Sequence, residues 1–144
     1  MIDAIIIRPN ELVLKRGARP HFERLLLTAA AKRLVSFGTF KIMKREGTII
    51  AMPSLPLDDA IAGMAASALA KTFGIAKIAL AVRVSRAIDA IAKASIQILT
   101  VRGAVSFKIE TRRTDKTYPM TSPEISAEVG ALVLETMPNI RVNV

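Results

Sequence analysis

The order of hydrophobic patterns in residues 1–84 is the feature that most restricts what this chain can fold into. Apolar residues alternate at period 2 in short runs, which predicts half-buried strands, and recur at period 3.6 in longer runs, which predicts helices. The order is strand, helix, strand, strand, helix, strand, at residues 4–7, 20–34, 39–44, 48–52, 58–73 and 75–84. That order is typical of the split βαβ, or ferredoxin-like, arrangement. The pattern therefore predicts an α+β unit, βαββαβ, with an antiparallel sheet.

The first predicted helix has an expected buried face and an expected solvent face. Pro20 suits its first turn, and Gly38 follows its end. The apolar side chains at helical spacing are expected to face the core: Phe22, Leu25, Leu26, Ala29, Ala30 and Leu34. The charged side chains are expected mostly on the other face: Glu23, Arg24, Lys32 and Arg33. Lys44 and Arg45, at the tip of the following hairpin, are typical of residues that favour solubility.

A second unit is predicted to begin near Ser85, which divides the chain into domains of residues 1–84 and 85–144. Ser85 is a suitable N-cap for a helix that runs through Leu99, and Gly103 ends it. A strand near 105–111, a helix near 123–136 and a last strand at 140–144 follow. No stretch rich in glycine and serine separates the two domains, so we expect them to pack rigidly.

The segment between the second unit's first strand and its next helix concentrates charge beside a helix start. Thr121 and Ser122 are both N-cap types, and Thr121 forms a predicted capping box with Glu124. Free N–H groups at a helix N-terminus attract anions. Three cations precede them: Arg112, Arg113 and Lys116. A phosphate site and a solvated loop with an ordinary cap both explain this pattern, and the residues alone leave the choice open.

Two stretches of the sequence resemble one protein family. Residues 115–125, DKTYPMTSPEI, followed by EVG at 128–130, resemble the core signature of THUMP RNA-binding domains, in the version found in tRNA 4-thiouridine synthetases. Near the start, ELVLK at 11–15 with Arg19 and Phe22 resembles the opening of the ferredoxin-like domain that precedes THUMP in those enzymes. Together the two stretches span most of the chain in the family's order.

The resemblance implies a ferredoxin-like unit followed by a partial THUMP α/β unit. THUMP domains of this type run on for at least one further strand after the position of Val144. The synthetases also carry a phosphate loop of the Ser-Gly-Gly-x-Asp-Ser kind, which this sequence lacks. We therefore expect a non-catalytic, tRNA-binding portion of such an enzyme. The family's role implies docking of the tRNA acceptor stem and 3′ end for 4-thiouridine synthesis. A catalytic domain or subunit in trans is a possible partner, and the sequence leaves open whether there is one.

The residues expected to contact RNA come from the two family motifs and from the predicted helix start. They are Lys15, Arg19, Arg112, Arg113, Lys116, Thr121 and Ser122. Tyr118 could stack on a base, as aromatic residues of RNA-binding modules do, or pack with Pro119 against the domain interface. Asp115 is expected to accept hydrogen bonds within its own turn and so to hold the basic loop in shape.

The charge of the chain agrees with an anionic partner. The net charge is +9, of which residues 1–85 carry +7 and residues 86–144 carry +2. A basic balance of this size is typical of proteins that bind nucleic acid or another anionic surface. The first half of the chain is therefore expected to carry most of the positive field.

Composition argues against most catalytic chemistry. The sequence has no cysteine, which excludes a sulfur relay or thiolate zinc site within it and fits a reducing cytoplasm. His21 is the only histidine, so neither a metal site nor a nucleophile–histidine–acid triad is expected. No catalytic residue and no cofactor are predicted. The most apolar long stretch, at 60–69, has about half of the roughly 20 residues that a membrane-spanning helix needs.

Two other functions remain open at this point. A THUMP adaptor could present RNA to another modifying enzyme, such as a methyltransferase or an acetyltransferase. A small ferredoxin-like enzyme, such as an acyl-phosphate hydrolase, could use the basic half to bind acidic substrates, although no positioned nucleophile or base is visible in the sequence.

Overall fold

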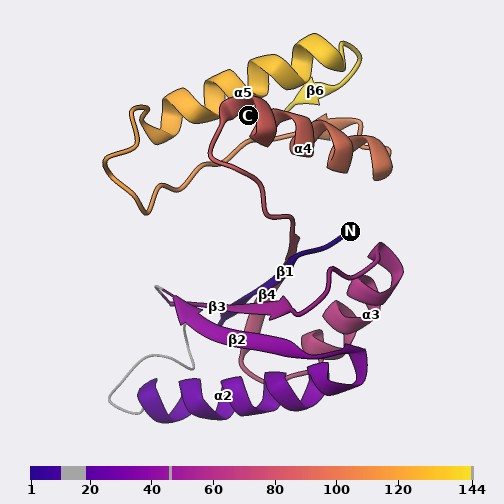
Figure 1. The fold of residues 1–144 in the computed structure, drawn as a ribbon, viewed down its shortest axis with the longest axis vertical. Coiled ribbons are helices and arrows are strands. Elements are labelled where there is room, and N and C mark those ends of the chain that lie inside the picture. The colour runs from indigo at the N-terminus through magenta and orange to yellow at the C-terminus, as the bar shows by residue number, and fades with distance from the viewer. Residues whose placement is uncertain (11–18, 46, 144) are drawn as a thin grey trace. The chain divides into compact units, whose positions relative to one another are not determined.

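A computed structural model describes residues 1–10, 19–45 and 47–143 (Figure 1). The contacts between residues divide the chain into two compact units, Met1–Arg83 and Val84–Val144, and each is described by itself. The stretch that contains Lys15 lies outside the described residues. Within the described residues, no helix has both the length and the apolar character that crossing a bilayer requires.

The first unit contains the predicted order of elements. The strands are β1 (Ala4–Pro9), β2 (Phe40–Arg45), β3 (Thr48–Pro53) and β4 (Ile75–Ala81). The helices are α2 (Arg19–Leu34), the short 3₁₀ helix η1 (Val35–Phe37) and α3 (Asp59–Ala70). The sheet order is β2-β3-β1-β4, and every neighbouring pair is antiparallel. This is the split βαβ topology, and the predicted α+β fold class is confirmed.

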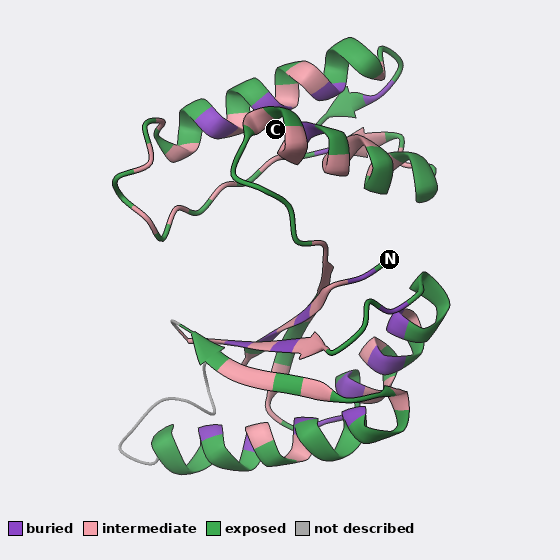
Figure 2. Cartoon of the chain, viewed as in Figure 1, coloured by how far each residue is buried: buried purple, intermediate pink, exposed green. Residues whose placement is uncertain are grey.

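One face of the sheet packs against the two helices. Ile5 lies opposite Ala51 and Leu80, and Ile7 lies opposite Ile49 and Ile78, so these side chains share a face. Ile5, Ile7, Ile49 and Ala51 are fully or almost fully buried. They form one core with residues of the helices: Leu26, Ala30, Leu34, Ala62, Ala65 and Leu69. Figure 2 shows the buried positions of α2 and α3 on the sides turned toward the sheet.

The buried face of α2 is rotated by part of a helical turn from the face that was predicted to be buried, so that prediction is wrong in part. Glu23, Leu26, Ala30 and Leu34 are its buried residues, whereas Phe22 is 37% and Leu25 is 52% exposed. Glu23 can occupy a buried position because Arg19 Nε donates to its carboxylate at 3.0 Å and Lys44 Nζ of β2 donates to the other oxygen. Lys44 therefore points to the helix side of the sheet as a partner of Glu23.

The start of α3 and the turn between β2 and β3 follow ordinary local chemistry. Asp58 is the N-cap of α3, and its Oδ1 accepts from Ile61 N at 2.8 Å, as acids at a helix start should. Gly47 has a φ of 77°, which the tight turn between β2 and β3 requires and which glycine adopts without strain.

The second unit is smaller and more helical. Its elements are α4 (Ile88–Val101), β5 (Ser106–Phe107), α5 (Ser122–Thr136) and β6 (Arg141–Val142). The two strands pair in parallel, Ser106 with Arg141 and Phe107 with Val142. The core consists of Ala92, Phe107, Ile125, Val129, Val133 and Ile140. The helix predicted near 123–136 is confirmed.

Three details of the second unit differ from the predictions. The last strand, expected at 140–144, is limited among the described residues to Arg141–Val142. The strand expected at 105–111 is only two residues long, because β6 gives it a partner at just those positions, and residues 108–111 continue as irregular chain. Ser85 is not the N-cap of α4. That position is held by Ala87, and the hydroxyl of Ser85, two residues earlier, accepts from Ala87 N at 3.4 Å.

Candidate functional site

The loop between β5 and α5, residues 108–121, is shaped by Asp115. Its Oδ1 accepts from the Thr117 backbone N at 2.9 Å and from the Thr117 hydroxyl, which confirms the predicted turn. Its Oδ2 accepts from Arg86 Nη1 at 2.9 Å. The Thr117 hydroxyl, the Thr117 N–H and then the Arg86 guanidinium hold the pKa of Asp115 below its ordinary value. Asp115 is therefore a charged anchor for the loop at neutral pH.

Arg86 connects this loop to the segment that enters α4. Besides the ion pair with Asp115, its backbone carbonyl accepts a hydrogen bond from the Tyr118 hydroxyl at 2.7 Å. Two residues of the loop thus meet one residue that lies about 30 positions earlier in the chain. The pair of contacts fixes both sides of the turn at 115–118 against the start of α4.

Arg113 stabilises the loop from within. Its Nη1 donates to the Tyr118 carbonyl at 3.2 Å and to the Lys116 carbonyl at 3.5 Å. Its side chain is partly buried, while Arg112 and Lys116 are exposed. The three predicted cations therefore lie in one loop, but Arg113 uses part of its hydrogen-bonding capacity on the loop's own backbone.

A hollow of about 210 Å³ lies beside this loop. Three arginines line it, Arg86, Arg112 and Arg113, together with Asp115 and Tyr118. The remaining lining residues are Ile91, Thr111, Thr114 and Ile125. Guanidinium groups bind phosphate and carboxylate oxygens in a bidentate fashion, so a hollow with this lining is suited to an anion.

The predicted cap of α5 is present. Thr121 is the N-cap, and its Oγ1 accepts from Glu124 N at 3.3 Å. The same hydroxyl donates to Glu124 Oε1 at 2.9 Å, whereas in the predicted capping box the carboxylate accepts from the backbone N–H of Thr121. Ser122 occupies the first helical position and is partly exposed. The Thr121 hydroxyl is therefore already engaged in hydrogen bonds of the cap.

Tyr118 packs within the second unit. Its ring is half-buried against the core of that unit, and its hydroxyl is engaged with the Arg86 carbonyl. Of the two roles predicted for it, base stacking stays a prediction, and the packing that the structure describes is internal to residues 84–143.

The predicted residues of the first unit form a separate group. Arg19 opens α2 and is paired with Glu23, and its guanidinium lies near the turn at Gly47. His21, in the next position but one, is exposed. Among the residues described, no three histidine, cysteine, aspartate or glutamate side chains come together as a metal site would require.

Sequence reasoning missed two residues that organise these sites, Arg86 and Glu23. Arg86 lies in an unpatterned segment, and its pairing with Asp115 spans 29 residues, so no local signal marks it. Glu23 had a local signal, because Arg19 and Glu23 have the i, i+4 spacing of a helical ion pair.

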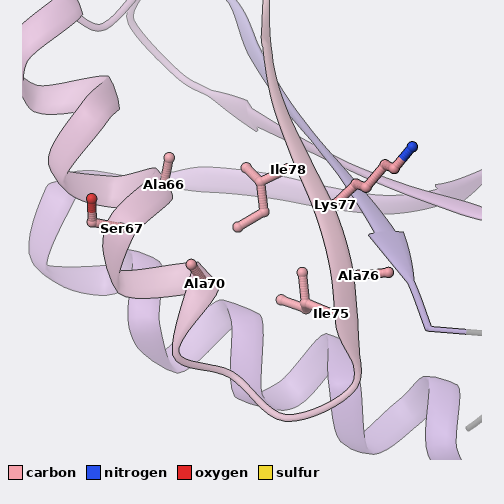
Figure 3. Close-up of a pocket in the computed structure, with 7 residues that line it drawn as sticks. All are labelled: Ala66, Ser67, Ala70, Ile75, Ala76, Lys77 and Ile78. Atoms are coloured by element: carbon pink, nitrogen blue, oxygen red, sulfur yellow. The ribbon is translucent and has the colours of Figure 1, made fainter.

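Two hollows described in the first unit each have a single cation in their lining, Lys77 in one and Lys71, together with Asp59, in the other. One hollow, of about 340 Å³, lies between α3 and β4 and is lined mainly by alanine and isoleucine side chains (Figure 3). Its polar members are Ser67 and Lys77. Convergent polar groups define most ligand sites, and this hollow offers few.

Comparison with known families assigns both units. Residues 4–79 match the ThiI ferredoxin-like domain, and residues 83–144 match the THUMP domain. The chain belongs to the ThiI family of ferredoxin-like and THUMP domains. The predicted family is thereby confirmed, and the two matches follow each other in the order that the motifs indicated.

Relatives of this ThiI-type chain match it over its whole length or nearly so. It is 33% identical to a "Probable tRNA sulfurtransferase" from Thermoanaerobacter sp. (strain X514), over 100% of this chain and 37% of the relative. It is 34% identical to a protein of the same name from Geobacillus kaustophilus (strain HTA426), over 99% of this chain and 35% of the relative. The chain thus spans little more than a third of the length of these relatives.

Two solved structures share the ThiI-type fold. PH1313 from Pyrococcus horikoshii Ot3 is 26% identical with a TM-score of 0.79, covering 99% of this chain and 47% of that one. A 4-thiouridine synthetase in complex with RNA and bound ATP is 25% identical with a TM-score of 0.74, covering 100% of this chain and 36% of that one.

Proposed function

We propose that this chain is a tRNA-binding module that docks the acceptor stem and 3′ end of tRNA for 4-thiouridine synthesis. One observation carries the proposal: the whole chain matches part of a 4-thiouridine synthetase that was solved in complex with RNA. The relatives named tRNA sulfurtransferase, which also match the full chain, support the same choice over an adaptor for another modifying enzyme.

The loop of the second unit supplies the chemistry for this role. Exposed Arg112 lines the hollow together with Arg86 and Arg113, and exposed Lys116 lies in the same loop. Asp115 and Arg86 hold the loop in one conformation. A preorganised set of cations loses little conformational entropy when it binds a phosphate backbone. Lys15 and Arg19 are proposed as the contribution of the first unit.

The proposed module does not carry out the reaction itself. A catalytic domain with a phosphate loop, in the same protein or in trans, would activate the uridine and supply sulfur. Incubation of this chain with tRNA, ATP and labelled sulfide is expected to yield no more thiolated nucleoside than a blank without protein. Thiolation above that blank would contradict the non-catalytic role.

Binding to an unmodified tRNA transcript tests the docking role. Fluorescence anisotropy at several salt concentrations should give a linear plot of log affinity against log salt. Affinity falls as salt rises, so the slope is negative. Arg112→Ala with Lys116→Ala should reduce its magnitude by about 1.4–1.8, because each phosphate contact contributes about 0.7–0.9. Where the affinity extrapolated to about 1 M salt is unchanged, the same slope change corresponds to an affinity loss of about 25- to 60-fold at about 0.1 M salt.

A matched control separates contact from net charge. Lys93→Ala with Arg102→Ala removes the same charge from exposed positions in and just after α4 and is expected to leave the slope nearly unchanged. Trimming the 3′ terminal nucleotides should weaken the wild type more than the Arg112, Lys116 variant. Equal binding of both variants and the wild type to intact tRNA would refute the docking role of the loop.

A further inference from the structure

The face of the first sheet turned away from α2 and α3 has its own composition. Residues directly opposite each other across strands point to the same face. One row across this open face is apolar and consists of Met43, Ile50, Ile6 and Ala79. These four side chains alternate along their strands with residues that face the helices, such as Ile5, Ile7 and Ile49.

Cations lie on both sides of this apolar row. Arg8 pairs with Lys77, and Arg45 pairs with Thr48, which sets three cations at one end of the face. Lys41 pairs with Met52 at the other end. Arg83, just after β4, donates from Nη2 to Met52 Sδ at 3.3 Å and so lies at the same end as Lys41. All five of these cations are exposed.

Figure 3 supports the direction of one of these side chains. Lys77 extends away from α3, whereas Ile78 extends toward it. Lys77 is therefore on the open face although its backbone borders the hollow beside α3.

The open face has no counter-charge within its strands. The four strands, as described, contain five lysine and arginine residues and no aspartate or glutamate. Lys44, the one strand cation on the helix side, is paired with Glu23. The sheet thus neutralises its inward cation, and its described strands place no carboxylate among the outward cations. Asp3, just before β1, accepts from the Arg83 backbone N–H at 2.9 Å, so an acid lies only beside the Arg83 end of the described surface. The excess of positive charge favours a polyanionic partner.

The face is suited to a phosphate backbone and not to the stacking of bases. Phe40, the only aromatic residue in the four strands, packs against the core on the helix side. Neighbouring strands lie about 4.8 Å apart, so Arg45 on one edge strand and Lys77 on the other are separated by about 14 Å. Cations at such a spacing reach different phosphates along a backbone.

We infer that this open sheet face, with Arg8, Lys41, Arg45, Lys77 and Arg83, is a second RNA-binding surface that contacts the phosphodiester backbone without reading sequence. The inference rests on the proposed tRNA-binding function and adds a surface distinct from the loop of the second unit. It also accounts for the larger share of the positive charge in residues 1–85.

Two substitutions on the edge strands test this surface in the full chain. Arg45→Gln with Lys77→Gln removes two cations and leaves the central strands β1 and β3 intact. With a fluorescent tRNA transcript as probe, the variant is expected to bind about 25- to 60-fold more weakly at about 0.1 M salt. The slope of log affinity against log salt should be smaller in magnitude by about 1.4–1.8. The loss should be the same for a tRNA of different acceptor-stem sequence, because phosphate contacts carry no sequence information.

A variant of equal charge change serves as control. Lys32→Gln with Arg33→Gln alters the exposed end of α2, and circular dichroism must show both variants folded.

Equal loss of tRNA affinity in the two variants would mean that only net charge matters, and this would overturn the inference. Tighter binding of the wild type to vesicles with anionic lipid than to tRNA, abolished by Arg45→Gln with Lys77→Gln, would also overturn it. If Arg112→Ala with Lys116→Ala weakens binding and Arg45→Gln with Lys77→Gln does not, the inference fails while the proposed function stands. Absence of RNA binding by the wild type would instead refute the proposed function.

Discussion

Glu23→Gln is expected to destabilise the first unit because it removes a buried negative charge from between two cations. The side chain of Glu23 is 9% exposed, whereas those of Arg19 and Lys44 are 52% and 49% exposed. Hydrogen bonds to charged groups contribute about 1.5–3 kcal/mol, but water screens the two half-exposed partners. We therefore expect the free energy of unfolding to fall by about 1–2 kcal/mol, below the roughly 3–5 kcal/mol typical of breaking a fully buried pair.

The loss should depend on pH in a defined direction. The hydrogen bond from Lys44, and then that from Arg19, hold the pKa of Glu23 below its ordinary value of 4.5, although burial acts against them. A carboxyl group with a lowered pKa in the folded state stabilises the fold fully above its unfolded pKa and loses that effect as pH falls through the folded value. The difference between wild type and Glu23→Gln should therefore be full near about pH 7 and shrink below pH 4.5.

Urea unfolding followed by far-ultraviolet circular dichroism measures this difference. Glu128→Gln, the same substitution at an exposed position of α5, is the control and should change the unfolding free energy by less than about 0.5 kcal/mol. A penalty for Glu23→Gln that is as large at about pH 3 as at about pH 7 would show that the carboxylate charge is not its source.

Three further substitutions have expected outcomes, all measurable by thermal or urea unfolding. Leu69→Ala, at a fully buried position of α3, should cost about 2–5 kcal/mol, whereas Leu55→Ala, which is 76% exposed, should cost less than about 0.5 kcal/mol; equal losses would contradict the described core. Thr121→Ala should cost about 1 kcal/mol through loss of the α5 cap, and Thr121→Ser should restore most of it; no recovery with serine would count against the cap. Tyr118→Phe keeps the packed ring and removes the hydrogen bond to Arg86, so a loss of about 0.5–1.5 kcal/mol is expected; a loss above about 3 kcal/mol would mean that the ring itself has moved.

Local patterns predicted those parts of the structure that local chemistry determines. The element order of the first unit follows from changes of period along the chain, and the cap at Thr121 and the turn at Asp115 depend on partners within three residues. The antiparallel sheet followed from that order because short connections leave few topologies. These features need no knowledge of distant residues.

The errors arose where a distant residue decides the outcome. The apolar pattern of α2 favoured Phe22 and Leu25 as core residues, yet Glu23 is buried because Lys44, 21 positions away, meets it from β2. Strand β5 is short because its partner β6 pairs with it at only two positions, which the alternation of residues 105–110 does not reveal. Arg86 has no motif around it and acquires its role only when the fold brings Asp115 beside it.

The same distinction separates the cations of the chain into two kinds. Arg19, Lys44, Arg86 and Arg113 each donate to a carboxylate or a backbone carbonyl, so they shape the molecule as well as charging it. Arg8, Lys41, Arg45 and Lys77 stand on a sheet face whose described strands contain no carboxylate. A cation of the first kind must give up an existing partner, or share it, before it meets a phosphate, and this offsets part of the gain. Net charge alone therefore overstates the contribution of the first kind, and the salt dependence of RNA binding should reflect mainly the second kind together with exposed Lys116.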